Sequence, residues 1–556
     1  MRRYLLSLLA VCLIGLAIYQ YYQPVSIVDV ITNEKLEIAA DNLNKRHPMK
    51  TLELSDYAKS QGVTLQSPLY QQFATNQVVN LQGRISLPKQ YPTQFVWVQI
   101  DYKGTESKAD FLQTFHYYIP IKNDQFQQSL TLQAGKGEYQ VTVRMPSNEK
   151  KEKFYTLTSF EVTNVNPEIN REISYNLKGR ESQLQLSKPA FGLVKTSRLV
   201  QISGSIKEKQ LLVQLRKGDQ VWRKTYAVHD GRFDESIPLL YGDGIHEVKL
   251  MVPDHKKAGY FVEGALFYVQ NTSPQVSKPI EYTRLYYEKG IRLTNPLSSG
   301  DQADLTYPIA GTIDPSKPGT DQINHVVVQT EKGKEKATYF IPVHQYRFDG
   351  NFWFRFGPGT YRVILYIPDA STTNRDYFRF LGVASFQVTS HVLTDQRDLL
   401  PSRGIQSDNP QIYQLAKQVT QGAKTDYKKA RKIYDYVATM MTYDMYKLRH
   451  NSFAWDDSAL KSLQERKGVC QDYVFLAIAM LRSLDIPSRF VEGEAGNQRH
   501  AWVEVKIGDH WISMDPTWGS GYITPNGKFV KKYDSNYFNP SKRYLNKTHK
   551  RTGVVY

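Results

Sequence analysis

The chain has 556 residues and a formal net charge of +17, and 38 of its many aromatic residues are tyrosines. This length exceeds what one hydrophobic core can fold, so several domains are expected, and the aromatic content argues against a disordered chain. The positive charge favours an anionic partner such as a cell-wall polymer or lipid head groups. No nucleic-acid-binding motif accompanies that charge, so nucleic acid is not expected as a partner.

The chain begins with a short apolar segment that is typical of a signal anchor. Arg2 and Arg3 precede an apolar run from Leu5 to Ile18, and tyrosines follow it at positions 19, 21 and 22. The basic residues predict a cytoplasmic N-terminus, and no A-x-A cleavage pattern follows the run. We therefore expect residues 1–23 to anchor the chain in the cell membrane by a single pass, with the rest extracellular. Cleavage and secretion is the alternative.

Residues 24–75 are mixed and polar, with weak helical patterns over 34–44 and 52–60. They predict a stalk or small helical spacer. A repeat follows, in which each of three phenylalanines precedes a glycine by 11 residues and that glycine precedes a proline by 9. The three frames are Phe126–Gly137–Pro146, Phe233–Gly244–Pro253 and Phe348–Gly359–Pro368.

Short alternating strands surround each frame and predict three tandem antiparallel β-sandwich modules of immunoglobulin-like type. Their expected ranges are 76–167, 180–275 and 280–390. Such modules serve as spacers or bind ligands, and the fold alone does not decide between these roles.

The pattern changes to helical after Thr389, so residues 391–556 predict a separate α+β domain. Helices are expected over 410–419, 425–441, 458–466 and 470–484. Strands are expected over 488–492, 499–507 and 510–514, with a hairpin turn at Gly508-Asp509 between the last two.

A thiol, an imidazole and a carboxylate follow one another along this domain in an order suited to nucleophilic catalysis. Cys470 begins the fourth predicted helix, where unpaired N–H groups and the helix dipole favour a thiolate. His500 and Asp515 lie on the two strands of the predicted hairpin, so that the carboxylate can hold the imidazole. Taken singly, each residue also has a structural explanation: a buried cysteine, a strand histidine and a turn carboxylate.

Other features narrow the chemistry of this site. The chain has two cysteines, and Cys12 lies in the apolar N-terminal segment, so Cys470 is expected to be a free thiol. The backbone N–H of Cys470 is the expected first oxyanion donor, and Gln471 and Trp455 are candidates for the second. No paired His or Cys spacing predicts a metal site, and no cofactor is expected.

Three segments of this domain resemble the transglutaminase-like superfamily, the papain-like thiol enzymes whose catalytic order is Cys, His, Asp. They are Gly468-Val-Cys-Gln-Asp-Tyr473, Arg499-His-Ala-Trp-Val-Glu504 and Met514-Asp-Pro-Thr-Trp518. The resemblance covers residues 400–556 and implies that Cys470, His500 and Asp515 form a catalytic triad. Trp455 to Leu460 also looks like bacterial secreted members. No acidic cluster resembles the calcium sites of animal transglutaminases.

The resemblance implies acyl transfer from an amide through a thioester and leaves the acceptor open. We expect a protein or peptide substrate at the cell surface or wall. The alternatives are a cysteine protease or amidase, or a wall-associated scaffold with an inactive domain. The tail over 528–556 holds eight Lys or Arg residues and one Asp. This tail is interpreted either as a solvated surface segment or as an attractant for an anionic wall polymer.

Overall fold

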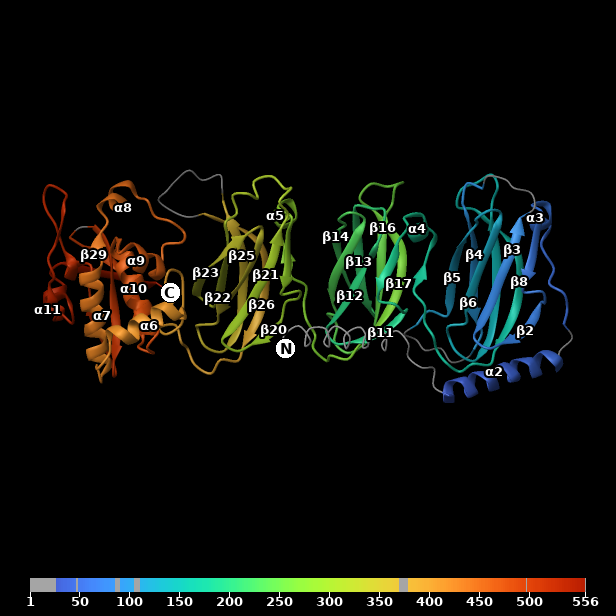
Figure 1. Ribbon diagram of the computed structural model, residues 1–556, viewed down its shortest axis with the longest axis horizontal. Helices are drawn as coiled ribbons and strands as arrows, with labels where there is room; N and C mark the ends of the chain where they lie inside the picture. The colour runs from blue at the N-terminus through green and yellow to red at the C-terminus, as the bar shows by residue number, and fades with distance from the viewer. Residues whose placement is uncertain are drawn as a thin grey trace, which may run out of the picture. The chain divides into compact units, whose positions relative to one another are not determined.

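The computed structural model describes residues 27–46, 49–85, 91–104, 111–369, 379–496 and 498–555 (Figure 1). The chain divides into two compact units, Met1–Gln275 and Val276–Tyr556. The first unit holds two β-sandwiches, and the second holds a third β-sandwich and an α+β domain. The predicted anchor lies outside the described residues, and no helix within the described ranges is long and apolar enough to cross a membrane.

The first sandwich has two sheets, with strand orders β1-β3-β6 and β2-β8-β7-β4-β5. Their bounds are β1 Val63–Ser67, β2 Gln72–Thr75, β3 Val78–Ile85, β4 Phe95–Tyr102, β5 Thr114–Pro120, β6 Gln125–Thr131, β7 Gly137–Pro146 and β8 Phe154–Asn164. The inward residues alternate along the strands, as in β7, where Tyr139, Val141 and Val143 are buried. This period of two is what buries one face of each sheet.

The first sandwich begins earlier than predicted, so the spacer assigned to 24–75 is wrong over its second half. Strand β1 pairs with β3, and β2 pairs with β8. The expected helical pattern near residue 52 is only the short helix α3 (Asp56–Ser60), with Ser55 as its N-cap. The sequence of a short strand is hard to distinguish from that of a spacer, because four or five residues show too little alternation of apolar and polar side chains.

One helix does precede the first sandwich, and it packs against that sandwich. Helix α2 (Ile27–Arg46) places Leu36, Ala40 and Leu43 against Ala74 and Val165. The amide oxygen of Asn44 also accepts a hydrogen bond from the backbone N–H of Ala74 at 2.6 Å. The helical half of the predicted spacer is therefore attached to the first module by apolar and polar contacts.

The second sandwich has sheets of order β10-β12-β15 and β11-β17-β16-β13-β14, with β9 also paired to β17. Its elements are β9 Ser174–Tyr175, α4 Leu177–Glu181, β10 Gln185–Lys188, β11 Leu193–Thr196, β12 Leu199–Ser205, β13 Gln210–Lys217, β14 Gln220–Ala227, β15 Arg232–Pro238, β16 Gly244–Pro253 and β17 Phe261–Asn271. The module therefore starts slightly before the predicted residue 180.

In the third sandwich the strands form one continuous order, β18-β26-β25-β22-β23-β24-β21-β19, and β20 also pairs with β26. The elements are β18 Glu281–Tyr282, α5 Arg284–Glu288, β19 Ile291–Asn295, β20 Asp301–Ala303, β21 Thr306–Ile313, β22 His325–Lys332, β23 Glu335–His344, β24 Arg347–Trp353, β25 Gly359–Pro368 and β26 Phe380–Ser390. The three modules confirm the predicted mostly β, immunoglobulin-like N-terminal region.

The repeated phenylalanine has the same packing role in every module. Phe126, Phe233 and Phe348 are buried, and each lies opposite a glycine on the neighbouring strand. The glycines are Gly83, Gly204 and Gly311, and a Cβ on any of them would come within 3.0 Å of the phenylalanine ring. The repeated phenylalanine therefore packs its ring directly on the backbone of the neighbouring strand, at a glycine that has no side chain to block it.

Each module also departs from a purely antiparallel sandwich in the same way. A short strand pairs in parallel with the last strand of its module, as β2 does with β8, β11 with β17 and β20 with β26. These segments have three or four residues. Their brevity explains why strand alternation alone did not predict them.

The C-terminal domain combines helices with a four-stranded sheet of order β31-β30-β29-β34. Its elements are α6 Pro410–Val419, α7 Asp426–Met440, β27 Thr442–Tyr443, α8 Met445–His450, α9 Ala459–Glu465, β28 Lys467–Gly468, α10 Cys470–Arg482, β29 Ser488–Ala495, β30 Gln498–Ile507, β31 His510–Met514, η1 Trp518–Ser520, β32 Gly521–Ile523, β33 Phe529–Lys531, η2 Ser535–Tyr537, α11 Lys542–Leu545 and β34 His549–Val555. The predicted α+β class and its major helices and strands are confirmed.

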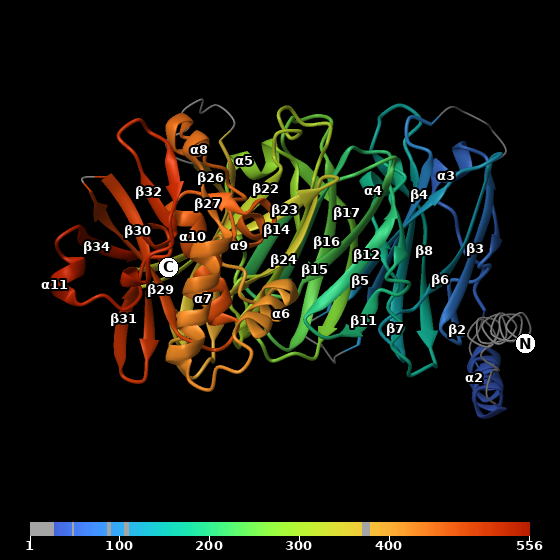
Figure 2. The same cartoon turned by 60° about the vertical axis from the view of Figure 1, so that its left-hand side comes forward.

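Helix α10 is the centre of this domain. Every residue from Asp472 to Arg482 is buried, so the helix is covered on all sides. Figure 2 shows α7 and α10 beside the sheet with β29 to β31, and α10 contacts both α7 and the strands β29 and β30. A helix that is apolar around its whole circumference belongs in a core. The first residue of this buried helix is Cys470.

Candidate active site

Cys470 lies at the start of α10 because the chain makes a tight turn before it, and the carboxylate of Asp472 accepts a backbone hydrogen bond of that turn. The carboxylate of Asp472 folds back and accepts a hydrogen bond from the N–H of Val469 at 2.8 Å. A Cβ on Gly468 would lie 2.4 Å from the Cβ of Asp472, so glycine is needed at that position. An acidic residue in the first turn also suits the helix dipole. The partly buried thiol of Cys470 is free, as predicted.

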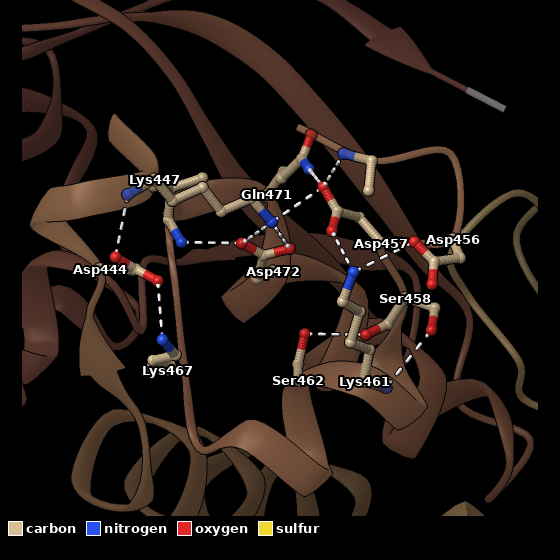
Figure 3. A network of polar contacts seen from close by, with 12 residues as sticks. Asp444, Lys447, Asp456, Asp457, Ser458, Lys461, Ser462, Lys467, Gln471 and Asp472 are labelled. Carbon is tan, nitrogen blue, oxygen red and sulfur yellow. Dashed lines mark hydrogen bonds and ion pairs between the residues drawn. The ribbon is translucent and has the colours of Figure 1, made fainter. Parts of the chain in front are cut away.

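A buried ionic network holds this helix start in place (Figure 3). The ammonium of Lys447, on α8, donates to both oxygens of Asp472 at 3.0 and 2.9 Å and lies 2.8 Å from Asp457 Oδ2. The side chains of Lys447, Asp457 and Asp472 are 12%, 3% and 4% exposed. Burial raises the pKa of Asp472, and the ammonium of Lys447 opposes that rise. Removing one partner from such a network leaves an uncompensated buried charge.

Both candidates for a second oxyanion donor make other contacts. The side-chain amide of Gln471 donates to Asp457 Oδ2 at 3.2 Å, within the ionic network. The indole of Trp455 stacks on His325 of the third sandwich, with ring centroids 4.0 Å apart. The backbone N–H groups of Cys470 and Gln471 remain the natural donors, since the first N–H groups of a helix lack intrahelical partners.

His500 and Asp515 are brought together by the hairpin of β30 and β31, as predicted. His500 lies near the start of β30, and Asp515 directly follows the end of β31. The Nε2 atom of His500 lies 2.8 Å from Asp515 Oδ2, and the two side chains are 7% and 1% exposed. The hairpin register runs without a break from Ile507–His510 to Val503–Met514, so the pairing brings the start of β30 close to the end of β31.

The charges of this pair favour an imidazolium. Burial alone would lower the pKa of His500, but the charge of Asp515 and hydrogen bonds to Asp515 and Cys470 outweigh it and raise the value to about 10. Burial would raise the pKa of Asp515, but His500 and His549 hold it well below its usual range. His500 therefore carries its proton at neutral pH and faces the thiol, as a thiolate–imidazolium pair requires.

His549 is a further residue of the site that the sequence analysis missed. Its Nε2 atom lies 3.0 Å from the same Asp515 Oδ2, and its side chain is fully buried. It belongs to β34, which pairs with β29 as the edge of the sheet. The basic tail is therefore part of the fold: β34 buries His549, while its basic residues Lys550 and Arg551 are exposed, as a solvated surface segment would have them. The burial of β34 does not alternate along the strand, so its sequence carries no period-two signal that would predict it.

Aromatic rings enclose the two imidazoles. Trp502 lies nearly parallel to His500, with centroids 6.2 Å apart, and Trp518 lies 4.8 Å from His549. Gly493 leaves room for this arrangement, since a Cβ there would lie 2.6 Å from the Trp502 ring. Trp511 instead lies beneath the guanidinium of Arg489. Two of the three tryptophans in the motif region thus form the wall of the site.

His500, Asp515 and His549 offer three ligand atoms within 4.8 Å of one another. Each imidazole nitrogen is 2.8 or 3.0 Å from the shared carboxylate oxygen. A tetrahedral zinc ion with bonds of about 2.0–2.1 Å would place its ligand atoms roughly 3.3 Å apart. The observed separations are those of hydrogen bonds, and metal binding would require the imidazoles to move away from the carboxylate.

Comparisons with known proteins place this domain in a family. A model of the transglutaminase-like superfamily matches residues 413–516, which include Cys470, His500 and Asp515. An uncharacterized protein of Mycobacterium leprae (strain TN) is 36% identical over 72 residues, a match that covers 11% of this chain and 25% of that protein. This chain thus spans about a quarter of the length of that relative.

Solved structures with some similarity include a protein of Cytophaga hutchinsonii assigned as a cysteine protease. It is 20% identical, with 50% of this chain and 85% of that chain covered and a TM-score of 0.21. A two-domain fibronectin type III segment of chicken tenascin is 12% identical, with 39% and 98% covered and a TM-score of 0.13. Given the family match and the arrangement around Cys470, the C-terminal domain of this chain belongs to the transglutaminase-like superfamily of thiol enzymes.

Proposed function

We propose that this chain is a membrane-anchored extracellular enzyme that transfers the acyl group of an amide through a thioester on Cys470. The observation that carries the proposal is the buried His500–Asp515 pair next to a free thiol at a helix start. Its substrates would be proteins or peptides at the cell surface or wall. The β-sandwich modules would act as spacers, and the basic surface would favour an anionic wall polymer.

The reaction begins when the Cys470 thiolate attacks the carbonyl carbon of a carboxamide or peptide bond. Backbone N–H groups at the start of α10 stabilise the oxyanion. The tetrahedral intermediate collapses as the His500 imidazolium gives its proton to the leaving ammonia or amine, which leaves a thioester and a neutral imidazole. An incoming amine or water then attacks the thioester while His500 accepts its proton. The acyl product leaves, and the thiolate–imidazolium pair is restored.

The acceptor decides between transamidation and hydrolysis, and one experiment separates them. The full-length chain in mild detergent is incubated with a glutamine-rich protein and a fluorescent primary amine, beside Cys470→Ala. We expect label incorporation that depends on Cys470. Cysteine-dependent cleavage or ammonia release without label would instead identify a protease or amidase.

Membrane attachment is tested separately in cells that express the full chain. We expect the protein to remain with the membrane after washing in high salt and to be accessible to protease from outside. Release into the medium would indicate that the N-terminal segment is cleaved.

A further inference from the structure

Asp515 receives more hydrogen bonds than a triad with one histidine provides. Among the described residues, its Oδ2 faces the Nε2 atoms of His500 and His549 at 2.8 and 3.0 Å. Its Oδ1 accepts from the backbone N–H groups of Thr517 and Trp518 at 2.9 and 3.1 Å. The orientation of the carboxylate is therefore maintained by the two backbone groups, and Oδ2 is shared by two imidazoles.

The hydrogen-bond partners of His549 show which of its ring nitrogens carries a proton. Its Nδ1 lies 2.8 Å from the Thr548 hydroxyl, which can either donate or accept. Its Nε2 faces a carboxylate oxygen that can only accept, so Nε2 carries a proton. His549 thus donates to Asp515 in whichever state the Nδ1 atom adopts.

The sheet topology brings His549 and His500 to the same place from two different strands. His500 on β30 and His549 on β34 flank β29 on opposite sides, and yet their ring centroids are 5.4 Å apart. They meet over Gly493 and Ala495, the residues of β29 that face them. The ring of His549 also contacts Trp502 and Trp518, so its position is held by packing as well as by the hydrogen bond.

We propose that His549 is a positioning residue which, by donating a second hydrogen bond to Asp515 Oδ2, limits how strongly this carboxylate retains the proton of His500. The inference rests on the proposed function, because His500 must release that proton to a leaving group. A carboxylate deprived of this donor becomes a stronger acceptor for His500. The imidazolium then becomes a weaker acid, so proton transfer to the leaving amine slows.

The other titratable groups that face the pair are one thiol and four tyrosines. The thiol is that of Cys470, which approaches from α10. Four tyrosines approach from neighbouring elements, and burial, with a contribution from the charge of Asp515, raises the pKa of each. They are Tyr434, Tyr443, Tyr473 and Tyr537. These tyrosines therefore stay neutral, and a shift in the pH profile would report on the imidazoles, the carboxylate and the thiol.

The test uses the alkylation rate of Cys470 by iodoacetamide across pH, which needs no knowledge of the substrate. In His549→Phe the ring volume remains but the donor is lost. The alkaline limb of the profile reports the loss of the His500 proton. We expect the midpoint of this limb to move to a higher pH by about half to one unit. His549→Gln, which offers an N–H at a similar reach, should return the limb toward the wild-type position. His246→Phe removes another buried histidine, in the second sandwich, and should leave the profile unchanged.

Two outcomes separate this inference from the proposed function. If His500→Gln alkylates like the wild type at every pH, the thiolate–imidazolium pair itself is absent and both fail. If His500→Gln differs from the wild type but His549→Phe does not, only the role of His549 fails. A profile shifted equally by His549→Phe and His549→Gln would also overturn that role.

A measurement on the wild-type chain keeps the inference testable should His549→Phe not fold. Nitrogen NMR of histidine-labelled protein, with His549 assigned through His549→Gln, reports whether Nε2 carries a proton. We expect a protonated Nε2 that is protected from exchange. An unprotonated Nε2 would rule out the second hydrogen bond.

Discussion

The ammonium of Lys447 lies 2.9 Å from Asp472 Oδ2, and this carboxylate in turn accepts the N–H of Val469, the residue before Cys470. A side chain of helix α8 is thereby linked through one carboxylate to the backbone that presents the thiol. Figure 3 shows how Asp457 and Gln471 join the same network. The position of the nucleophile thus depends on charges that are themselves buried.

Replacing Lys447 should destabilise the domain strongly. Lys447→Met leaves the buried carboxylate of Asp472 without its ammonium partner, while Asp457 beside it keeps Lys461 at 3.3 Å, and we expect a loss of about 3–5 kcal/mol. Urea unfolding of the full chain measures this, and the alkylation rate of Cys470 should fall with it. Lys429→Met, which removes a surface pair with Asp426, is the matched control and should cost less than about 1 kcal/mol. Equal effects of the two changes would argue against the network.

The ionisation of His500 predicts a stability that depends on pH. Its pKa in the folded protein is raised to about 10, so its contribution is complete below its ordinary value near 6.5 and disappears as the pH rises through about 10. Asp515, whose pKa is lowered, contributes above its ordinary value and loses that contribution as the pH falls. The difference in unfolding free energy between the wild type and His500→Gln should therefore shrink between about pH 7 and 10. A constant difference would contradict the raised pKa.

Adding one methyl group at Gly493 should disrupt the site without touching the triad. A Cβ there would lie 2.3 Å from the carbonyl oxygen of Lys550 and 2.6 Å from Trp502. Gly493→Ala should push β34 and the indole away, with a loss of about 1–3 kcal/mol and slower alkylation of Cys470. Gly553→Ala on β34 meets nothing within 4 Å and serves as the control. A Gly493→Ala variant as stable as that control would disprove the close approach.

The repeated phenylalanine–glycine pair predicts the same kind of sensitivity in the third sandwich. In Gly311→Ala the new Cβ would lie 2.5 Å from the Phe348 ring and 2.6 Å from the carbonyl oxygen of Arg292. We expect a loss of about 1–3 kcal/mol from overpacking. Gly382→Ala, whose Cβ would meet Tyr366 only at 3.7 Å, should be close to neutral. Thermal unfolding of the two variants compares them directly.

The chain order of the elements could be predicted where periodicity and capping signals were strong. Helices α6 and α7 begin within one residue of the predicted positions 410 and 425, with Asn409 and Thr425 as their N-caps, and β31 has the predicted bounds. Very short segments such as β2 and β27 could not be predicted, because a strand of two to four residues has too little alternation to be recognised. The parallel edge strands of the three modules belong to this group.

The sequence alone determined the class of domains, the repeat and the three residues of the proposed triad, since each depends on local spacing and residue type. Only the tertiary structure could reveal His549, because its contact with Asp515 joins residues 34 apart in the sequence through a strand order that places β34 beside β29. The same holds for Lys447, which meets Asp472 from a separate short helix. Local patterns specify which side chains face inward, but the pairing of distant strands and helices decides which of them meet.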